Sequence, residues 1–76
     1  VPQDYKEAVR LYRLSAGQGN AEAQDTLGSM YFKGRGGLPQ VYKEGVKWTR
    51  LAAEQGNADA QHNLGFMYYH GLFCRN

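Results

Sequence analysis

The sequence predicts an all-α fold in which αα-hairpin repeats stack side by side as a short α/α solenoid. Three observations support this prediction. The chain repeats itself, apolar residues recur at helical spacing in each copy, and no segment shows the alternation typical of a strand. At 76 residues, with one cysteine and therefore no internal disulfide, the chain is too short for a thick conventional core, which also favours stacked units.

The repeat is visible when the sequence is shifted by 37 positions, which places residues 1–36 over 38–73. We therefore divide the single segment 1–76 into two equivalent repeat units, 1–36 and 38–74, with a loop at 34–40. The identical stretches are Tyr-Lys-Glu at 5–7 and 42–44, Gln-Gly-Asn-Ala at 18–21 and 55–58, and Leu-Gly at 27–28 and 64–65.

The first element of each unit, residues 4–18 and 41–55, is predicted to be a helix. In 41–55 small and apolar side chains, Gly45 and Thr49 among them, recur at positions i, i+3, i+4 and i+7. Trp48 widens this apolar stripe. A wide stripe predicts a helix that packs against neighbours on two sides.

A short Gln-Gly-Asn turn follows each of these helices. Gly19 and Gly56 stand where a helix end favours the left-handed conformation, which glycine adopts without steric cost. Asn20 and Asn57 come next and are expected to cap the following helix through their side chains. Such a short connection favours two antiparallel helices, an αα-hairpin.

The second element of each unit, residues 21–33 and 58–70, is also predicted to be helical. Each contains an interior glycine, Gly28 or Gly65, which destabilises a helix by about 0.5–1 kcal/mol relative to alanine. Because this glycine recurs in both units, we expect each one to let a neighbouring helix approach closely. The loop 34–40 is rich in glycine and contains a proline, both of which stop the preceding helix.

The residues from Asn20 to Tyr31 resemble the first-helix signature of Sel1-like repeats (SLR), and those from Gly34 to Gly56 are similar to the loop and second helix of that family. The resemblance implies a tetratricopeptide-like, short right-handed superhelix that serves as a scaffold or adaptor for protein partners. In this register the chain begins with a second helix and ends with a first helix. The chain departs from the pattern at Gly17, where the second unit has Glu54, and in a loop one residue longer.

The same resemblance implies a binding site, because in tetratricopeptide relatives the first helix of each repeat lines a concave groove. Phe66, Tyr69 and His62 are expected to anchor a protein or peptide ligand there, with Asp25 and Lys33 steering it. An alternative is that Phe66 and Tyr69 pack against a neighbouring repeat. The full set of expected partner-binding residues is Asp25, Ser29, Phe32, Lys33, His62, Phe66, Tyr69 and His70.

A second interpretation is structural: the chain is a segment of a longer repeat array that stacks end to end on other copies or on flanking repeats. Repeat proteins generally need three or more units for stability, which favours this role. Self-association through the end helices is therefore also open.

Enzymatic activity is not expected. Some members of the family resemble proteins credited with binding or cleaving penicillin-type antibiotics, yet the Ser-x-x-Lys motif is missing because Ser29 and Lys33 are one residue too far apart. The glycines at 34–37 lack the Lys-Ser/Thr ending of a phosphate-binding loop. We therefore expect neither β-lactamase-like activity nor a cofactor.

A metal site is also not expected. His70 and Cys74 stand four residues apart, but Gly71 is predicted to end the helix between them, and His62 would be a strained third ligand. Cys74 is interpreted either as a free thiol or, outside the cytosol, as half of an intermolecular disulfide.

Charge and hydropathy exclude two classes of partner. The net charge of +2 arises from nine Lys and Arg and seven Asp and Glu spread along the chain, so no basic patch predicts nucleic-acid binding. No stretch approaches the roughly 18 apolar residues of a membrane helix. The start, Val-Pro-Gln-Asp, does not resemble a signal peptide, and a start without methionine suggests a processed chain or a piece of a longer one. These residues assign no cellular compartment.

Overall fold

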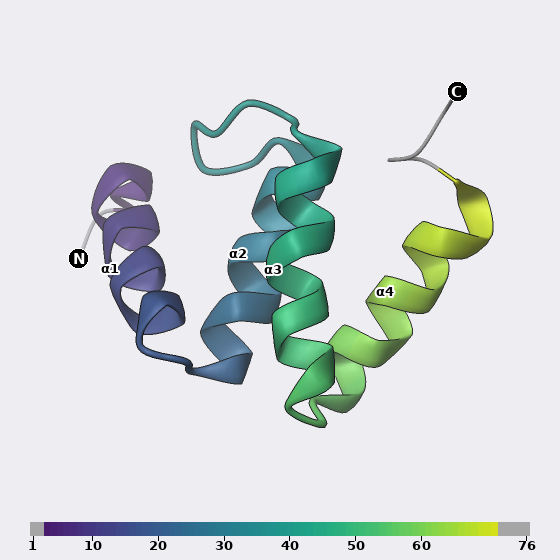
Figure 1. Cartoon of the computed structure of the whole chain (residues 1–76). Coiled ribbons are helices and arrows are strands. Elements are labelled where there is room, and N and C mark those ends of the chain that lie inside the picture. The colour runs from purple at the N-terminus through teal and green to yellow at the C-terminus, as the bar shows by residue number, and fades with distance from the viewer. Residues whose placement is uncertain (1–2, 72–76) are drawn as a thin grey trace.

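The computed structural model describes residues 3–71. Within them the chain forms four α-helices of 13 residues and no strand. Figure 1 shows the helices side by side in chain order, each antiparallel to the one before it. In chain order the helices are α1 (Tyr5–Gly17), α2 (Ala21–Lys33), α3 (Tyr42–Glu54) and α4 (Ala58–His70).

The all-α prediction is confirmed, and the predicted boundaries shift by a single residue at the ends of α1 and α3. Asp4 and Val41 are N-caps rather than helical residues, and Gln18 and Gln55 are C-caps. The Asp4 carboxylate accepts a hydrogen bond from the backbone N–H of Glu7 at 3.1 Å, which satisfies one of the free donors at the start of α1.

The two Gln-Gly-Asn turns adopt the predicted conformation. Gly19 and Gly56 have φ angles of 96° and 93°, in the left-handed region that favours glycine. The side chains of Asn20 and Asn57 each accept a hydrogen bond at 2.8 Å from the backbone N–H three residues later. The same short turn therefore closes both hairpins, α1–α2 and α3–α4.

The loop between α2 and α3 is tied to the last turn of α2. The Gln40 side-chain amide donates to the carbonyl of Phe32 at 3.0 Å, and the backbone N–H of Val41 donates to the carbonyl of Tyr31 at 2.9 Å. These bonds satisfy carbonyls that a helix end leaves free. They bring the start of α3 back onto α2.

The core lies where α2 meets its two neighbours. Leu27 is fully buried at the centre of α2, and Trp48 of α3 packs against it from one side. The buried cluster consists of Ala16, Ala23, Leu27 and Tyr31, with the partly buried Leu38, Val41 and Trp48 against it.

The closest approach of two helices occurs between α2 and α3, at Gly28. A Cβ atom at Gly28 would lie 2.9 Å from both the carbonyl oxygen of Gly45 and the backbone nitrogen of Thr49, inside van der Waals contact. A Cβ atom at Gly45 would lie 3.0 Å from the carbonyl oxygen of Gly28. The expected role of Gly28 is therefore confirmed, and Gly45 supplies the other half of the contact.

Within residues 3–71 the expected close approach is not seen at Gly65. A Cβ atom there would meet no heavy atom of the described residues within 4 Å, so none of the described helices approaches α4 at this glycine. The reason is its position in the row: α4 is the last of the described helices, and only its inner side meets α3.

Large apolar side chains remain exposed mainly at the two ends of the row. Residues 3–71 contain no helix long and apolar enough to span a membrane. The exposed large apolar residues are Tyr5, Leu11, Tyr12 and Leu14 on α1, Leu51 on α3, and Phe66, Tyr68 and Tyr69 on α4.

Candidate functional site

A hollow of about 210 Å³ lies between α2 and α4, the two helices that follow the Gln-Gly-Asn turns. We call it the α2–α4 groove. It is lined by Ser29, Phe32 and Lys33 from α2 and by His62, Asn63, Phe66 and Met67 from α4. Five of the eight residues expected from the sequence therefore meet here, although 29 and 66 are far apart in the chain.

A hydrogen bond between the two hairpins holds the walls of the groove in place. The Asn63 side-chain amide donates to the Asp25 carboxylate at 3.2 Å, and both side chains are partly buried. Asp25 was expected to face a ligand. In the structure this carboxylate is engaged in fixing α4 against α2, which preorganises the groove.

Aromatic rings extend from the groove towards the end of α4. Phe66 is 48% exposed, and the ring of His70 lies 4.2 Å from it, centroid to centroid. The Tyr69 ring is 87% exposed and contacts the His70 ring edge-on, with the two ring centroids 5.1 Å apart. Tyr69 and His70, both expected site residues, thus do not line the hollow, and the His70 ring contacts Phe66, which does.

A neighbouring hollow of about 300 Å³ continues the surface along α2 towards the loop. Ser29 and Lys33 line both hollows, so they form the ridge between them. Arg35 lines the second hollow and adds a second cation beside Lys33. Positive charge therefore gathers at the loop end of α2.

Sequence reasoning missed three of these residues: Asn63, Met67 and Arg35. Asn63 stands three residues before Phe66 and four before Met67, a spacing that places it beside both side chains on the helix. That spacing was a usable signal. The signal for Arg35 was its place directly after the helix-ending Gly34, where its backbone N–H donates to the carbonyl of Met30 at 2.9 Å.

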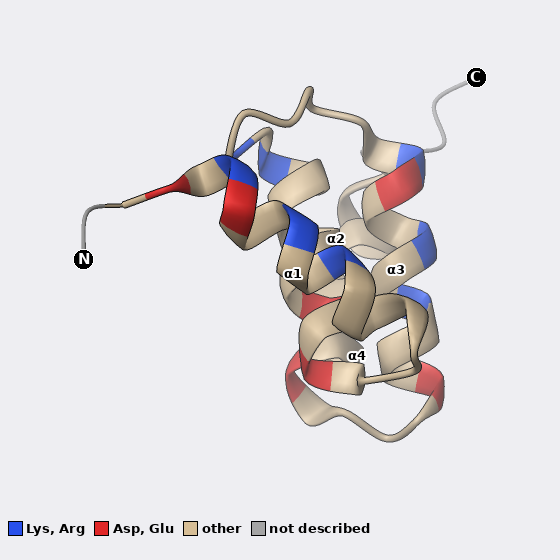
Figure 2. Ribbon diagram, turned by 90° about the vertical axis from the view of Figure 1, so that its left-hand side faces the viewer, with Lys and Arg blue, Asp and Glu red and all other residues tan. Residues whose placement is uncertain are grey.

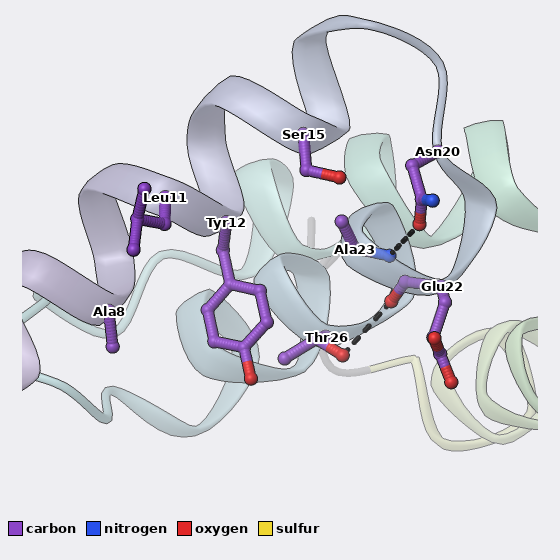
Figure 3. A pocket seen from close by; sticks show the side chains of 8 residues that line it. All are labelled: Ala8, Leu11, Tyr12, Ser15, Asn20, Glu22, Ala23 and Thr26. Carbon is purple, nitrogen blue, oxygen red and sulfur yellow. Dashed lines mark hydrogen bonds between the residues drawn. The ribbon is translucent and has the colours of Figure 1, made fainter.

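A larger hollow, of about 680 Å³, lies between α1 and α2 at the other end of the row (Figure 3). The hydroxyl of Thr26 donates to the backbone carbonyl of Glu22 at 2.9 Å within this wall. The hollow lies outside the eight expected site residues. Its lining residues are Ala8, Leu11, Tyr12, Ser15, Asn20, Glu22, Ala23 and Thr26.

In residues 3–71 no three His, Cys, Asp or Glu side chains lie close enough together to hold a metal ion. Cys74, the second member of the His70–Cys74 pair, lies outside the described residues.

The family model of the Sel1 repeat matches residues 1–20, 21–57 and 58–75. The chain belongs to the Sel1 repeat family. Sel1 repeats are generally protein-interaction modules, and proteins built from them typically bind other proteins. A search of curated proteins found no significant relative. In the family's division, α2 and α3 form one complete Sel1 repeat, and the groove lies between the first helices of that repeat and the next.

Proposed function

We propose that this Sel1 repeat chain binds a segment of a partner protein in the α2–α4 groove. The observation that carries the proposal is the convergence of two repeats on one hollow, where Phe32 and Phe66 lie with Lys33 and His62. Protein-binding surfaces combine such aromatic anchors with polar groups that fix orientation. A helix from each repeat supplies half of the site.

Phe66 is the proposed anchor. It is half-exposed, it lines the groove, and the His70 ring supports it from behind at 4.2 Å. A partner side chain that covers Phe66 would remove its exposed apolar area from water, which is the main source of affinity at such sites. Tyr69 extends the same surface beyond the hollow.

Lys33 and Arg35 are proposed to steer an acidic partner segment towards Phe66. Both are exposed cations at the loop end of α2, and long-range attraction between opposite charges raises the rate of encounter. Asp25 was expected to share this steering role, and because its carboxylate accepts a hydrogen bond from Asn63, we propose that it also supports the groove.

The dimensions of the groove favour a protein segment over a small ligand. At about 210 Å³ it is smaller than the roughly 300–1,000 Å³ typical of small-molecule pockets. We propose binding without catalysis. Ser29 and His62 line the groove and are of the residue types that act as nucleophile and base in enzymes. An activated nucleophile is hydrogen-bonded to its base, and in the described part of the chain no hydrogen bond joins these two side chains.

The test begins with peptides selected from a displayed random library against the wild-type chain. Phe66→Ala is expected to weaken their binding about tenfold or more, and Phe66→Ala/Tyr69→Ala to abolish it. The matched control is Leu51→Ala, which removes an apolar side chain of similar exposure on α3, outside the groove. The control should bind like the wild type.

Circular dichroism would establish that each variant keeps its helices. The proposal is wrong if Phe66→Ala, still folded, binds the selected peptides as tightly as the wild type. It is also wrong if the peptides shift the NMR signals of α1 and leave those of Ser29, His62 and Phe66 unchanged.

A further inference from the structure

α4 contains an interior glycine that the described fold does not use. Among residues 3–71, Gly65 has no heavy atom within 4 Å of its Cβ position, and a glycine there destabilises the helix by about 0.5–1 kcal/mol relative to alanine. Its counterpart in the other repeat is Gly28, where α3 packs closely against α2. Gly65 is thus an equivalent packing position against which none of the described helices packs.

A glutamine on α4 likewise lacks a contact that its counterpart on α2 makes. Gln24 of α2 donates to the carbonyl of Ala16 at 3.1 Å and accepts from the side chain of Gln55 on the α3 side at 2.8 Å. Its counterpart Gln61 donates to the carbonyl of Ala53 at 3.2 Å, but within residues 3–71 its side-chain oxygen accepts nothing. The acceptor that receives Gln55 in one repeat is open in the other.

The opposite end of the row presents the complementary face. α1 occupies in its repeat the place that α3 occupies in the next, and it forms one wall of the 680 Å³ hollow, with α2 as the other (Figure 3). Gln18 follows α1 at the position of Gln55 and is exposed. The α1 residues in the hollow, Ala8, Leu11, Tyr12 and Ser15, stand at the positions of Gly45, Trp48, Thr49 and Ala52 in α3.

The two faces are close but not perfect copies of the internal contact. A Cβ atom at Gly45 would lie 3.0 Å from the carbonyl oxygen of Gly28, so Ala8 in that place requires a slightly wider spacing of the helices. Tyr12 replaces the smaller Thr49, and its ring stands at the edge of the hollow (Figure 3). We therefore expect a contact of the same kind as α2–α3, but weaker.

The charges of the two end helices are also complementary. α1 carries Lys6, Arg10 and Arg13 with a single carboxylate, Glu7, whereas α4 carries Asp59 and neither Lys nor Arg. Figure 2 shows the Lys and Arg residues of α1 along its surface. Opposite net charge favours the approach of α1 to α4 over the approach of either helix to its own copy.

We propose that copies of this chain associate head to tail, with α4 of one copy packed against α1 of the next as α2 packs against α3 within the chain. Such a contact uses two different surfaces, so each copy added leaves one α1 and one α4 free. The expected product is an open series of oligomers whose mean size grows with concentration.

Sedimentation velocity of the full chain, across a concentration series and with reductant present to exclude a Cys74 disulfide, tests the proposal. The wild-type mass is expected to rise above that of the monomer. Gly65→Leu is expected to weaken association at least about tenfold, because the added side chain occupies the space into which α1 of the next copy would pack. The helix content of this variant should stay the same or rise. Gly17→Leu, an exposed glycine with equally open surroundings, is the matched control and should associate like the wild type.

A mixing experiment tests the head-to-tail arrangement itself. Gly65→Leu blocks the α4 face and keeps α1 intact, whereas Leu11→Glu blocks the α1 face at an exposed position and keeps α4 intact. At a concentration where the wild type associates and a tenfold weaker contact does not form, each variant alone is expected to be monomeric. An equimolar mixture is expected to form a one-to-one dimer that grows no further.

Three results would overturn the proposal: a wild-type chain that is monomeric at every concentration, a Gly65→Leu variant that associates as well as the wild type, or a Leu11→Glu variant that dimerises alone through two α4 faces. The outcome is independent of the α2–α4 groove. Gly65→Leu should still bind the selected peptides, and Phe66→Ala should still associate.

Discussion

The helices α2 and α4 share most of their inward-facing residues, yet they are buried to very different extents. Leu27 of α2 is fully buried, whereas its counterpart Leu64 on α4 is only partly buried. Gln24 is 4% exposed, whereas Gln61 lies on the surface. The cause is that α2 lies between α1 and α3, and α4 meets α3 on one side only.

The difference shows that in a repeat protein the contribution of a given residue to stability depends on the position of its helix in the row. Each helix buries a face only against its neighbours, so an inner helix is stabilised twice and an end helix once. Matched substitutions at equivalent positions of the two repeats measure this effect directly, because residue type and helix position are held constant.

The largest difference is expected for Leu27→Ala against Leu64→Ala. Leu27→Ala removes a fully buried side chain and should lower the free energy of unfolding by about 2–5 kcal/mol. Leu64→Ala should cost less than half as much, because part of that side chain already faces water. Urea denaturation followed by circular dichroism gives both values. Equal losses would contradict the account of burial by position.

The glycine pair is expected to respond with opposite signs. Gly28→Ala would place a Cβ atom 2.9 Å from the backbone of α3 and should destabilise the chain by about 1–3 kcal/mol. Gly65→Ala meets open space and should stabilise it by about 0.5–1 kcal/mol through helix propensity. Thermal unfolding, at a concentration low enough to keep the chain monomeric, measures both. Two shifts of the same sign would refute the comparison.

The glutamine pair is expected to show a smaller effect. Gln24→Ala leaves the carbonyl of Ala16 and the side chain of Gln55 without their hydrogen bonds in a buried site, at a cost of about 1–3 kcal/mol. Gln61→Ala removes one exposed hydrogen bond and should cost less than about 0.5 kcal/mol. Chemical denaturation of both variants checks the difference, and a Gln61 effect as large as that of Gln24 would count against it.

The smallest effect is expected for the equivalent ion pairs on α1 and α3. Arg10 hydrogen-bonds the Glu7 carboxylate at 2.6 Å and lowers the pKa of that exposed carboxyl below its usual 4.5. The counterpart pair, Glu44 and Lys47, is longer at 3.9 Å. A lowered pKa in the folded state stabilises the fold at neutral pH, and this contribution disappears as the pH falls through the folded-state pKa.

Glu7→Gln is therefore expected to lower the Tm slightly at pH 7 and to leave it unchanged in acid well below pH 4.5. Glu44→Gln is the matched control and should shift the Tm less. An NMR titration of the Glu7 carboxyl would report the pKa itself. A Glu7 pKa at or above its usual value would remove the basis of this prediction.

Local chemistry was enough to predict the helices and the turns. The Asn20 and Asn57 caps, the left-handed glycines and the helical spacing are all properties of a few neighbouring residues, and the structure confirms each of them. The helix ends shifted by one residue because Asp4 and Val41 precede their helices as N-caps. For the groove, the family resemblance selected Phe66 and His62, and the fold brings these two residues of α4 together with Ser29, Phe32 and Lys33 of α2.

The remainder depends on contacts between residues far apart in the chain. Asp25 supports the groove because Asn63 reaches it across the hairpins, and no spacing within α2 encodes that bond.

The sequence by itself determined the repeat, its four helices, its turns and its membership of the Sel1 repeat family, because these depend on local conformational preferences and on residue order. Only the tertiary structure decided which copy of each shared residue contacts a neighbouring helix and which copy stays exposed. Gly28 and Gly65 occupy equivalent positions in the two repeats, and Gly28 is in contact with α3 while no atom of residues 3–71 lies within 4 Å of the Cβ position of Gly65. The physical reason is that a helix face gains stability only from the helix placed against it.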